Sequence, residues 1–170
     1  MREIEAKILE VNRRELEARL KEIGAKKIAD RNITSIFFDF PNKRLKKQKS
    51  ILRLRKDEEG AFLCVKKKSR ESRFKDLDEF EVKVESFDET KKILSMLGLA
   101  EVKAGKKKRT SYLLNGIGIE IDEIDGIPAF AEIEASSEKE IEETAKKLGF
   151  SPKQLLPWST FDVLKHYKKK

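Results

Sequence analysis

Short segments of the sequence alternate charged and bulky apolar residues, and the charges within each segment have one sign. Glu3-Ile4-Glu5 is an acidic example and Arg53-Leu54-Arg55 a basic one. Residues two apart lie on the same face of a β-strand, roughly 6.5–7 Å apart, so each segment places like charges on one face. The other segments are Glu79-Phe80-Glu81, Glu120-Ile121-Asp122, Glu132-Ile133-Glu134, Lys66-Lys67-Lys68 and Lys107-Lys108-Arg109.

The hydrophobic periodicity predicts many antiparallel strands and a few amphipathic helices, which is typical of the α+β class. Helices are expected to begin near Asn12, Asp88 and Ser137, each ending at a glycine, and further helical segments to begin at Ser151 and Ser159. The expected strands are 2–9, 26–40, 50–56, 61–68, 78–85, 100–114, 117–124 and 129–135.

The length and composition exclude several classes of protein. The longest apolar run, Ala61–Val65, is far shorter than the roughly 20 residues of a membrane-spanning helix, and the N-terminus has no apolar signal region. We therefore expect a cytoplasmic protein, with a single domain over residues 1–170 because no linker interrupts the chain. Heavy use of Lys and Glu with only two Gln favours a thermophilic source.

The clustering of like charges leaves two interpretations of the strands. A solvated sheet face normally mixes signs, because like charges side by side repel each other. The segments therefore form either an outer face of one sign or a charged functional interior. The net charge of +8 indicates anionic partners.

A charged interior needs a mobile partner that neutralises it. One Cys (Cys64) and one His (His166) leave oxygen atoms as the main metal ligands, which suits Mg²⁺ or Mn²⁺. Arg and Lys clusters suit phosphate oxygens. A metal–polyphosphate complex would satisfy both sets of charges together.

The same segments, in order along nearly the whole chain, resemble the motifs of the CYTH superfamily, the triphosphate tunnel metalloenzymes. Glu3-Ile4-Glu5-Ala6-Lys7 is similar to the N-terminal ExExK signature, and Ile51–Arg55 resembles the LRxR strand. The later motifs are matched by Lys66, by Glu79 and Glu81, by Lys107, Arg109 and Tyr112, by Asp122, Glu132 and Glu134, and by the ending Trp158–Leu164.

The resemblance implies an eight-stranded antiparallel β-barrel, the triphosphate tunnel, with helices packed outside. It implies a Mg²⁺ or Mn²⁺ cofactor and is compatible with a homodimer. The implied phosphate contacts are Lys7, Arg53, Arg55, Lys66, Lys107 and Arg109. The implied metal ligands are Glu3, Glu5, Asp122, Glu132 and Glu134, while Glu79 and Glu81 either ligate metal or orient the basic residues.

Three positions depart from the family pattern. Asp76-Leu77-Asp78 stands where the family often has an Arg, and Phe161 replaces a common Tyr. Glu120 is not a common family position, so we expect it at the rim or in solvent.

Several functions fit these residues. The family includes class IV adenylyl cyclases, thiamine triphosphatases and inorganic triphosphatases, and the segments look nearest to the cyclase branch. Conversion of ATP to cyclic AMP and pyrophosphate is therefore the expected reaction, and hydrolysis of thiamine triphosphate, a nucleoside triphosphate or tripolyphosphate is the alternative. A nucleic-acid-binding basic domain and a triphosphate binder without turnover are further hypotheses. The sequence does not indicate the general base.

Residues outside the motifs have simpler expectations. Cys64 is expected in the apolar core, His166, Lys67 and Lys108 in solvent, and the basic stretch 43–49 in a loop. Trp158 either packs the last helix onto the barrel or stacks on a base at the tunnel mouth.

Overall fold

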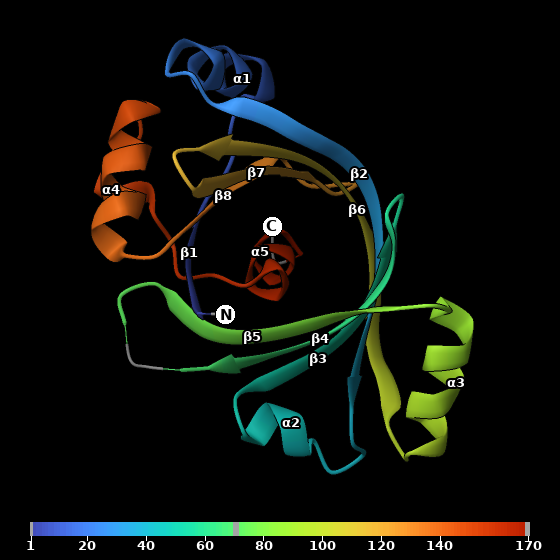
Figure 1. The fold of residues 1–170 in the computed structure, drawn as a ribbon. Helices are drawn as coiled ribbons and strands as arrows, with labels where there is room; N and C mark the ends of the chain where they lie inside the picture. The colour runs from blue at the N-terminus through green and yellow to red at the C-terminus, as the bar shows by residue number, and fades with distance from the viewer. Residues whose placement is uncertain (1, 70–71, 169–170) are drawn as a thin grey trace. The chain divides into compact units, whose positions relative to one another are not determined.

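The structure is a computed structural model that describes residues 2–69 and 72–168. Its eight antiparallel strands form a closed β-barrel in the order β1-β5-β4-β3-β2-β6-β7-β8 (Figure 1). This confirms the expected α+β barrel. The strands are β1 (Arg2–Ile8), β2 (Lys26–Asp39), β3 (Ser50–Asp57), β4 (Gly60–Lys68), β5 (Lys75–Val84), β6 (Ala100–Leu114), β7 (Ile117–Glu123) and β8 (Phe130–Ala135).

The helices follow the sequence expectation, with one addition. They are α1 (Arg13–Glu22), α2 (Arg44–Lys47), α3 (Phe87–Met96), α4 (Glu138–Lys147), the 3₁₀ turn η1 (Pro152–Gln154) and α5 (Thr160–Tyr167). Within the described residues, none of these helices has the length and apolar character needed to cross a bilayer. Contacts divide the chain into two compact units: a first unit of residues 1–2, 31–70 and 77–107, and a second unit of residues 3–30, 71–76 and 108–170.

The core of the first unit lies on one face of β2 and β3. Leu52 and Leu54 are buried there against Leu94 of α3, together with Ile36 and Phe38 of β2. Because successive strand residues point to opposite faces, Arg53 and Arg55 lie on the face of β3 that is turned away from this core.

The core of the second unit lies between its strands and the helices α1 and α4. Ile4 of β1, Ile121 of β7 and Ile133 of β8 are buried in one apolar cluster, together with Leu20 of α1 and Ile141 of α4. The side chains that alternate with these strand residues lie on the opposite face. In this way the apolar members of the alternating segments fix which face carries the charges.

The short helix α2 corrects the expectation of a loop over residues 43–49. The buried carboxylate of Asp39 accepts hydrogen bonds from the backbone N–H groups of Phe40 (2.7 Å), Leu45 (2.9 Å) and Lys46 (3.1 Å). These bonds satisfy backbone donors that a short basic segment would otherwise leave to solvent, so they hold the helix.

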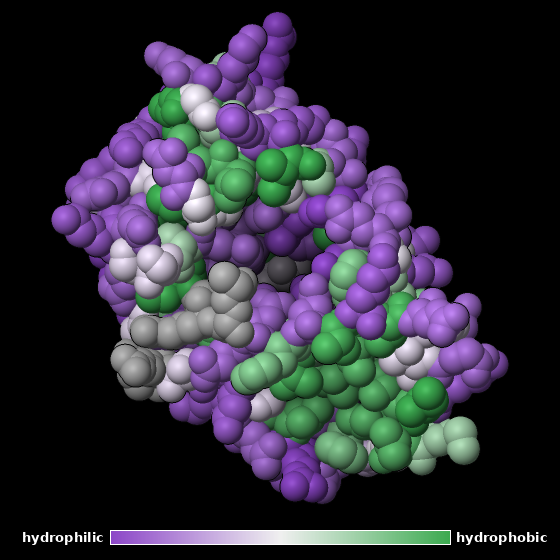
Figure 2. Space-filling view, in the orientation of Figure 1, coloured by the Kyte–Doolittle hydropathy of each residue, from purple (hydrophilic) through white to green (hydrophobic). Residues whose placement is uncertain are grey.

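The first unit exposes several large apolar side chains. They come from β4, β5, α3 and β6, and Figure 2 shows apolar residues gathered on this face of the molecule. The residues are Val65, Phe80, Val82, Ile93, Met96, Leu97 and Val102.

We predict that two isoleucines in strands of the second unit differ strongly in their contribution to stability. Ile133 is fully buried, so Ile133→Ala is expected to lower the free energy of unfolding by about 2–5 kcal/mol. Ile28 is 56% exposed, so Ile28→Ala is expected to cost about 1 kcal/mol or less. Urea unfolding measures both, and equal losses would contradict the assignment of the core.

Candidate functional site

Each unit carries one cluster of charged side chains on its strands. The first-unit cluster consists of Arg53, Arg55, Asp57, Cys64, Lys66, Glu79 and Glu81. The second-unit cluster consists of Glu5, Lys7, Lys75, Arg109, Glu120, Asp122, Glu132 and Glu134.

Strand register brings opposite charges together in the second-unit cluster. Lys7 lies directly opposite Glu132 across the β1–β8 pair, and Arg109 lies opposite Asp122 across the β6–β7 pair. Register also places like charges opposite each other, since Glu5 faces Glu134. Such acidic pairs are destabilising unless cations compensate for them.

Lys7 is one of the compensating cations. Its ammonium group donates a hydrogen bond to Glu132 and lies 3.8 Å from a carboxylate oxygen of Glu5. The side chain is only 2% exposed. Burial alone would lower the pKa of Lys7, but the charges of Glu132 and Glu5 outweigh it and raise the pKa above 10.5. Lys7 therefore remains an ammonium ion at neutral pH.

Arg109 donates two parallel hydrogen bonds to the carboxylate of Asp122. Its Nε donates to one carboxylate oxygen at 2.6 Å and a terminal nitrogen donates to the other at 2.7 Å. The same terminal nitrogen also reaches Glu132 at 3.3 Å. Burial would lower the pKa of Arg109, but the negative charges of Asp122, Glu132 and Glu120 hold it far above its ordinary value. Planar, forked guanidinium donors of this kind also match phosphate oxygens.

Glu120 corrects an expectation. It was predicted at the rim or in solvent, yet its side chain is only 13% exposed and lies 3.8 Å from Arg109. Ser111 donates a hydrogen bond to it at 2.5 Å, and Glu132 lies directly opposite it across β7–β8. Glu120 lies two residues before Asp122 in β7, so the spacing already indicated that both side chains point to the same face of the strand.

Lys75 is a member of the cluster that the sequence did not indicate. It begins β5, and its ammonium group donates a hydrogen bond to Glu5. The family pattern pointed to a missing Arg near residues 76–78, and Lys75 supplies a cation one residue earlier. The sequence feature that could have indicated this cation was therefore Lys75 itself, next to the positions where the family often has an Arg.

The first-unit cluster pairs arginines with an acidic strand. Arg55 donates two hydrogen bonds to Glu81, at 3.1 and 2.9 Å, and another to Asp57. Arg53 reaches Glu81 at 3.2 Å, and Lys66 lies 2.5 Å from Glu79. Glu79 and Glu81 are therefore ion-paired with basic residues of the cluster, a geometry compatible with the orienting role that the resemblance implied for them.

Cys64 lies inside this charged cluster and not in the apolar core. Its thiol donates a hydrogen bond to Glu79 at 2.9 Å. Burial raises the pKa of Cys64 to about 12, with the charge of Arg53 opposing and that of Glu79 adding to the effect. The thiol therefore stays protonated at neutral pH, and a thiolate nucleophile is not expected here.

The remaining predicted residues lie as follows. Lys107 is half-buried, two residues from Arg109 and on the same face of β6, whereas Lys67 and Lys108 are exposed as expected. Glu3 lies in β1, and its side chain is outside the described residues.

The carboxylates of the second-unit cluster fit a hard divalent cation. One oxygen each of Glu5, Glu132 and Glu134 lies within 4.8 Å of the others, and the group offers oxygen ligands only. Oxygen-only ligand sets suit Mg²⁺ and Mn²⁺. In the first-unit cluster, Cys64, Glu79 and Glu81 also converge within 4.8 Å, with a protonated thiol in place of one carboxylate.

The fold and the two clusters define a class of α+β proteins: closed antiparallel barrels whose strands carry buried, ion-paired carboxylates and cations. The model of the CYTH domain family matches residues 1–157, and the chain belongs to that family.

Three known proteins are similar to this chain. One from Methanocaldococcus jannaschii, named "Putative adenylate cyclase", is 30% identical over 137 residues, which cover 80% of this chain and 78% of that protein. A "putative adenylate cyclase" from Vibrio parahaemolyticus superposes with a TM-score of 0.83 at 20% identity, covering 96% of this chain and 97% of that one. A Hippeastrum "putative adenylyl cyclase" described as having a dominant triphosphatase activity superposes with a TM-score of 0.67 at 17% identity, covering 96% and 95%.

We predict that Glu81 contributes to acid sensitivity. Burial alone would raise the pKa of Glu81, but hydrogen bonds from Arg55 and the charges of both arginines hold it below 4.5. Its stabilising contribution is thus present above the unfolded pKa and is lost as pH falls through the folded pKa. Urea unfolding between about pH 6 and pH 3 should show a smaller loss of stability for Glu81→Gln than for wild type.

Glu85→Gln is the control, since Glu85 is exposed just beyond the same strand. Identical pH dependence in wild type and Glu81→Gln would contradict the ion-pair assignment.

Proposed function

We propose that the protein is a divalent-metal-dependent enzyme acting on triphosphates, and that it converts ATP into cyclic AMP and pyrophosphate. One observation carries the proposal: the second-unit cluster brings five carboxylates together with three cations, and each cation is ion-paired with a carboxylate. The relatives named as adenylate cyclases support the choice of reaction.

The ion pairs can exchange partners without leaving a charge unpaired. Removing one member of a buried pair costs about 3–5 kcal/mol because the other stays buried and uncompensated. A bound phosphate compensates Lys7 and Arg109 while a bound cation compensates Glu132. A metal-complexed triphosphate brings both charges at once, so each group that loses its partner in an ion pair gains a new one from the ligand.

The proposed ligands keep the roles that the resemblance implied. Glu5, Glu132 and Glu134 would hold the metal, with Glu3 and Asp122 as further candidates. When bound, the metal supplies charge neutralisation at the transferring phosphoryl group. The phosphate ligands would be Lys7, Arg53, Arg55, Lys66, Lys107 and Arg109.

In the cyclase reaction, the 3′-oxygen of ATP forms a bond to the α-phosphorus. The bond from that phosphorus to the oxygen bridging to the β-phosphate breaks, so pyrophosphate leaves and the 3′-hydroxyl loses its proton. Arg109 and Lys7 keep their positive charge, because their pKa values are raised, and they stabilise the negative charge on the phosphate oxygens.

Triphosphate hydrolysis is the second candidate, and the Hippeastrum neighbour with dominant triphosphatase activity favours it. Water would then attack the γ-phosphorus, the bond from that phosphorus to the oxygen bridging to the β-phosphate would break, and orthophosphate and the diphosphate would be released. The same cations and carboxylates serve both reactions. Binding to nucleic acid is disfavoured, because Lys7, Arg55, Lys66 and Arg109 are ion-paired with carboxylates within their clusters.

We predict that removing a charge from either cluster lowers turnover by about two orders of magnitude or more, since the proposed site then lacks a metal ligand or a cation that stabilises the charge on the phosphates. The variants are Glu5→Gln and Arg55→Ala, with Lys66→Ala as a third. Lys67→Ala is the matched control, because Lys67 neighbours Lys66 on β4 but is exposed. Circular dichroism checks folding, and wild-type rates in both Glu5→Gln and Arg55→Ala would refute the site.

Product analysis tests the reaction itself. The purified protein is incubated with ATP, thiamine triphosphate or tripolyphosphate and with Mg²⁺ or Mn²⁺, and the products are separated by chromatography. Cyclic AMP with pyrophosphate is the expected result. Orthophosphate without cyclic AMP would establish a triphosphatase, and absence of every product at all metal concentrations would overturn the enzymatic proposal.

A further inference from the structure

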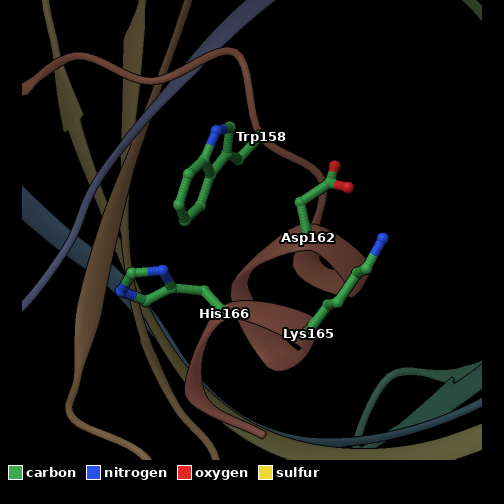
Figure 3. Close-up of a pocket in the computed structure, with 4 residues that line it drawn as sticks. All are labelled: Trp158, Asp162, Lys165 and His166. Atoms are coloured by element: carbon green, nitrogen blue, oxygen red, sulfur yellow. The ribbon is translucent and has the colours of Figure 1, made fainter. Parts of the chain in front are cut away.

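A pocket in the second unit lies beside the C-terminal helix α5. It has a volume of about 490 Å³ and is lined by Trp158, Asp162, Lys165 and His166 (Figure 3). The rings of Trp158 and His166 touch, with centroids 5.2 Å apart and planes tilted by 55°. The imidazole of His166 also makes an edge contact with the ring of Tyr167, with centroids 4.9 Å apart and planes at 82°. The pocket therefore combines the two contacting rings of Trp158 and His166 with one carboxylate and one ammonium group.

The segment before the pocket is fixed to the second-unit cluster. Leu156 pairs with Lys7 of β1 through two backbone hydrogen bonds of 2.9 Å each. Trp158 follows two residues later, and Ser159 then caps α5 by accepting from the backbone N–H of Asp162. Trp158 is thus anchored on both sides, two residues along the chain from Leu156, which pairs with Lys7 of the cluster.

The side chain of Lys75 also connects the pocket with the cluster. Lys75 interacts electrostatically with Asp162 of the pocket and donates a hydrogen bond to Glu5 of the cluster. Lys75 therefore links a residue of the pocket with a residue of the cluster. Phe130, Lys7 and the rest of the cluster belong to the same compact unit as α5.

The polar groups of the pocket have unused hydrogen-bonding capacity. Oδ2 of Asp162 accepts from the backbone N–H of Ser159 at 2.8 Å and from its hydroxyl at 2.6 Å. Within residues 2–69 and 72–168, Oδ1 of Asp162 and Nζ of Lys165 have no hydrogen-bond partner. Burial would raise the pKa of Asp162, but the hydrogen bonds from Ser159 and the charges of Lys75 and Lys165 lower it, so the carboxylate stays ionised.

We propose that this pocket binds the nucleobase of a nucleoside triphosphate, namely adenine, while the second-unit cluster holds the phosphates; this inference rests on the proposed function. The base would stack on the open face of the Trp158–His166 pair, since aromatic side chains stack with bases. Oδ1 of Asp162 accepts one N–H of the exocyclic amino group, and Lys165 donates to a ring nitrogen. Inorganic tripolyphosphate has no group that uses these contacts.

The single tryptophan of the chain makes the proposal directly measurable. Trp158 is the only tryptophan in the sequence, so the intrinsic emission reports on this pocket alone. We expect ATP with Mg²⁺ to quench the emission of the wild-type protein and tripolyphosphate with Mg²⁺ to leave it nearly unchanged. Quenching that is equal for both ligands, or stronger for thiamine triphosphate than for ATP, would overturn the adenine assignment.

Calorimetry of variants separates base binding from phosphate binding. Trp158→Leu is expected to weaken ATP binding by about 5–150-fold, which is the range for loss of one stacked base, and to leave tripolyphosphate binding within about twofold. Trp158→Phe should restore most of the ATP affinity. Lys165→Ala should weaken ATP binding alone, whereas Lys168→Ala, which lies beyond the pocket at the end of α5, should change neither ligand.

The two proposals fail in different ways. If tripolyphosphate and ATP both bind with Mg²⁺ and neither Trp158→Leu nor Lys165→Ala changes their ratio, the pocket assignment is overturned and the triphosphate site stands. If neither ligand binds, both proposals are overturned. Equal weakening of both ligands by Trp158→Leu would make Trp158 a packing residue and would also overturn the pocket.

Discussion

The cross-strand ion pair is the interaction on which the charged face of this protein depends. Lys7 meets Glu132, Arg109 meets Asp122 and Lys66 meets Glu79, each pair directly opposite in its strand register. A slip of one residue would turn the charges of a strand into the apolar core and its Ile or Leu residues out of it. Burial of Ile133 and Leu54 therefore fixes the register, and the register fixes the pairing of charges.

These pairs account for the presence of so many charges on the strands, and the proposed function depends on the same pairs. Unpaired buried charges would be too costly to keep, so every strong cation of the second-unit cluster is held against a carboxylate. The same arrangement keeps Lys7 and Arg109 charged and close to the carboxylate oxygens that converge within 4.8 Å of one another. Under the proposed function, these groups are the partners of a ligand that carries both signs, as a metal-complexed triphosphate does.

The alternation of charged and apolar residues predicted the features that depend on nearby residues of the chain. It did not predict contacts between residues that are far apart in the sequence. The period of two gave the strands and the charged faces, because each strand alternates with its own core residues. Lys75 was missed since its partner Glu5 lies 70 residues away. Helix α2 was missed because its N-cap residue, Lys43, has no capping side chain, and the carboxylate that holds the helix, Asp39, lies outside the basic stretch. The two alternatives for Trp158 depend on tertiary contacts, which the sequence pattern does not indicate.

The most direct test of partner exchange is calorimetric titration of the wild-type protein with tripolyphosphate in the presence and absence of Mg²⁺, corrected for complex formation in solution. Each ligand alone would displace one set of charges and leave the other unpaired, whereas the complex satisfies both. The account predicts that Mg²⁺ tightens tripolyphosphate binding by about tenfold or more, and tripolyphosphate tightens Mg²⁺ binding by the same factor. Binding of each ligand that is independent of the other would contradict it.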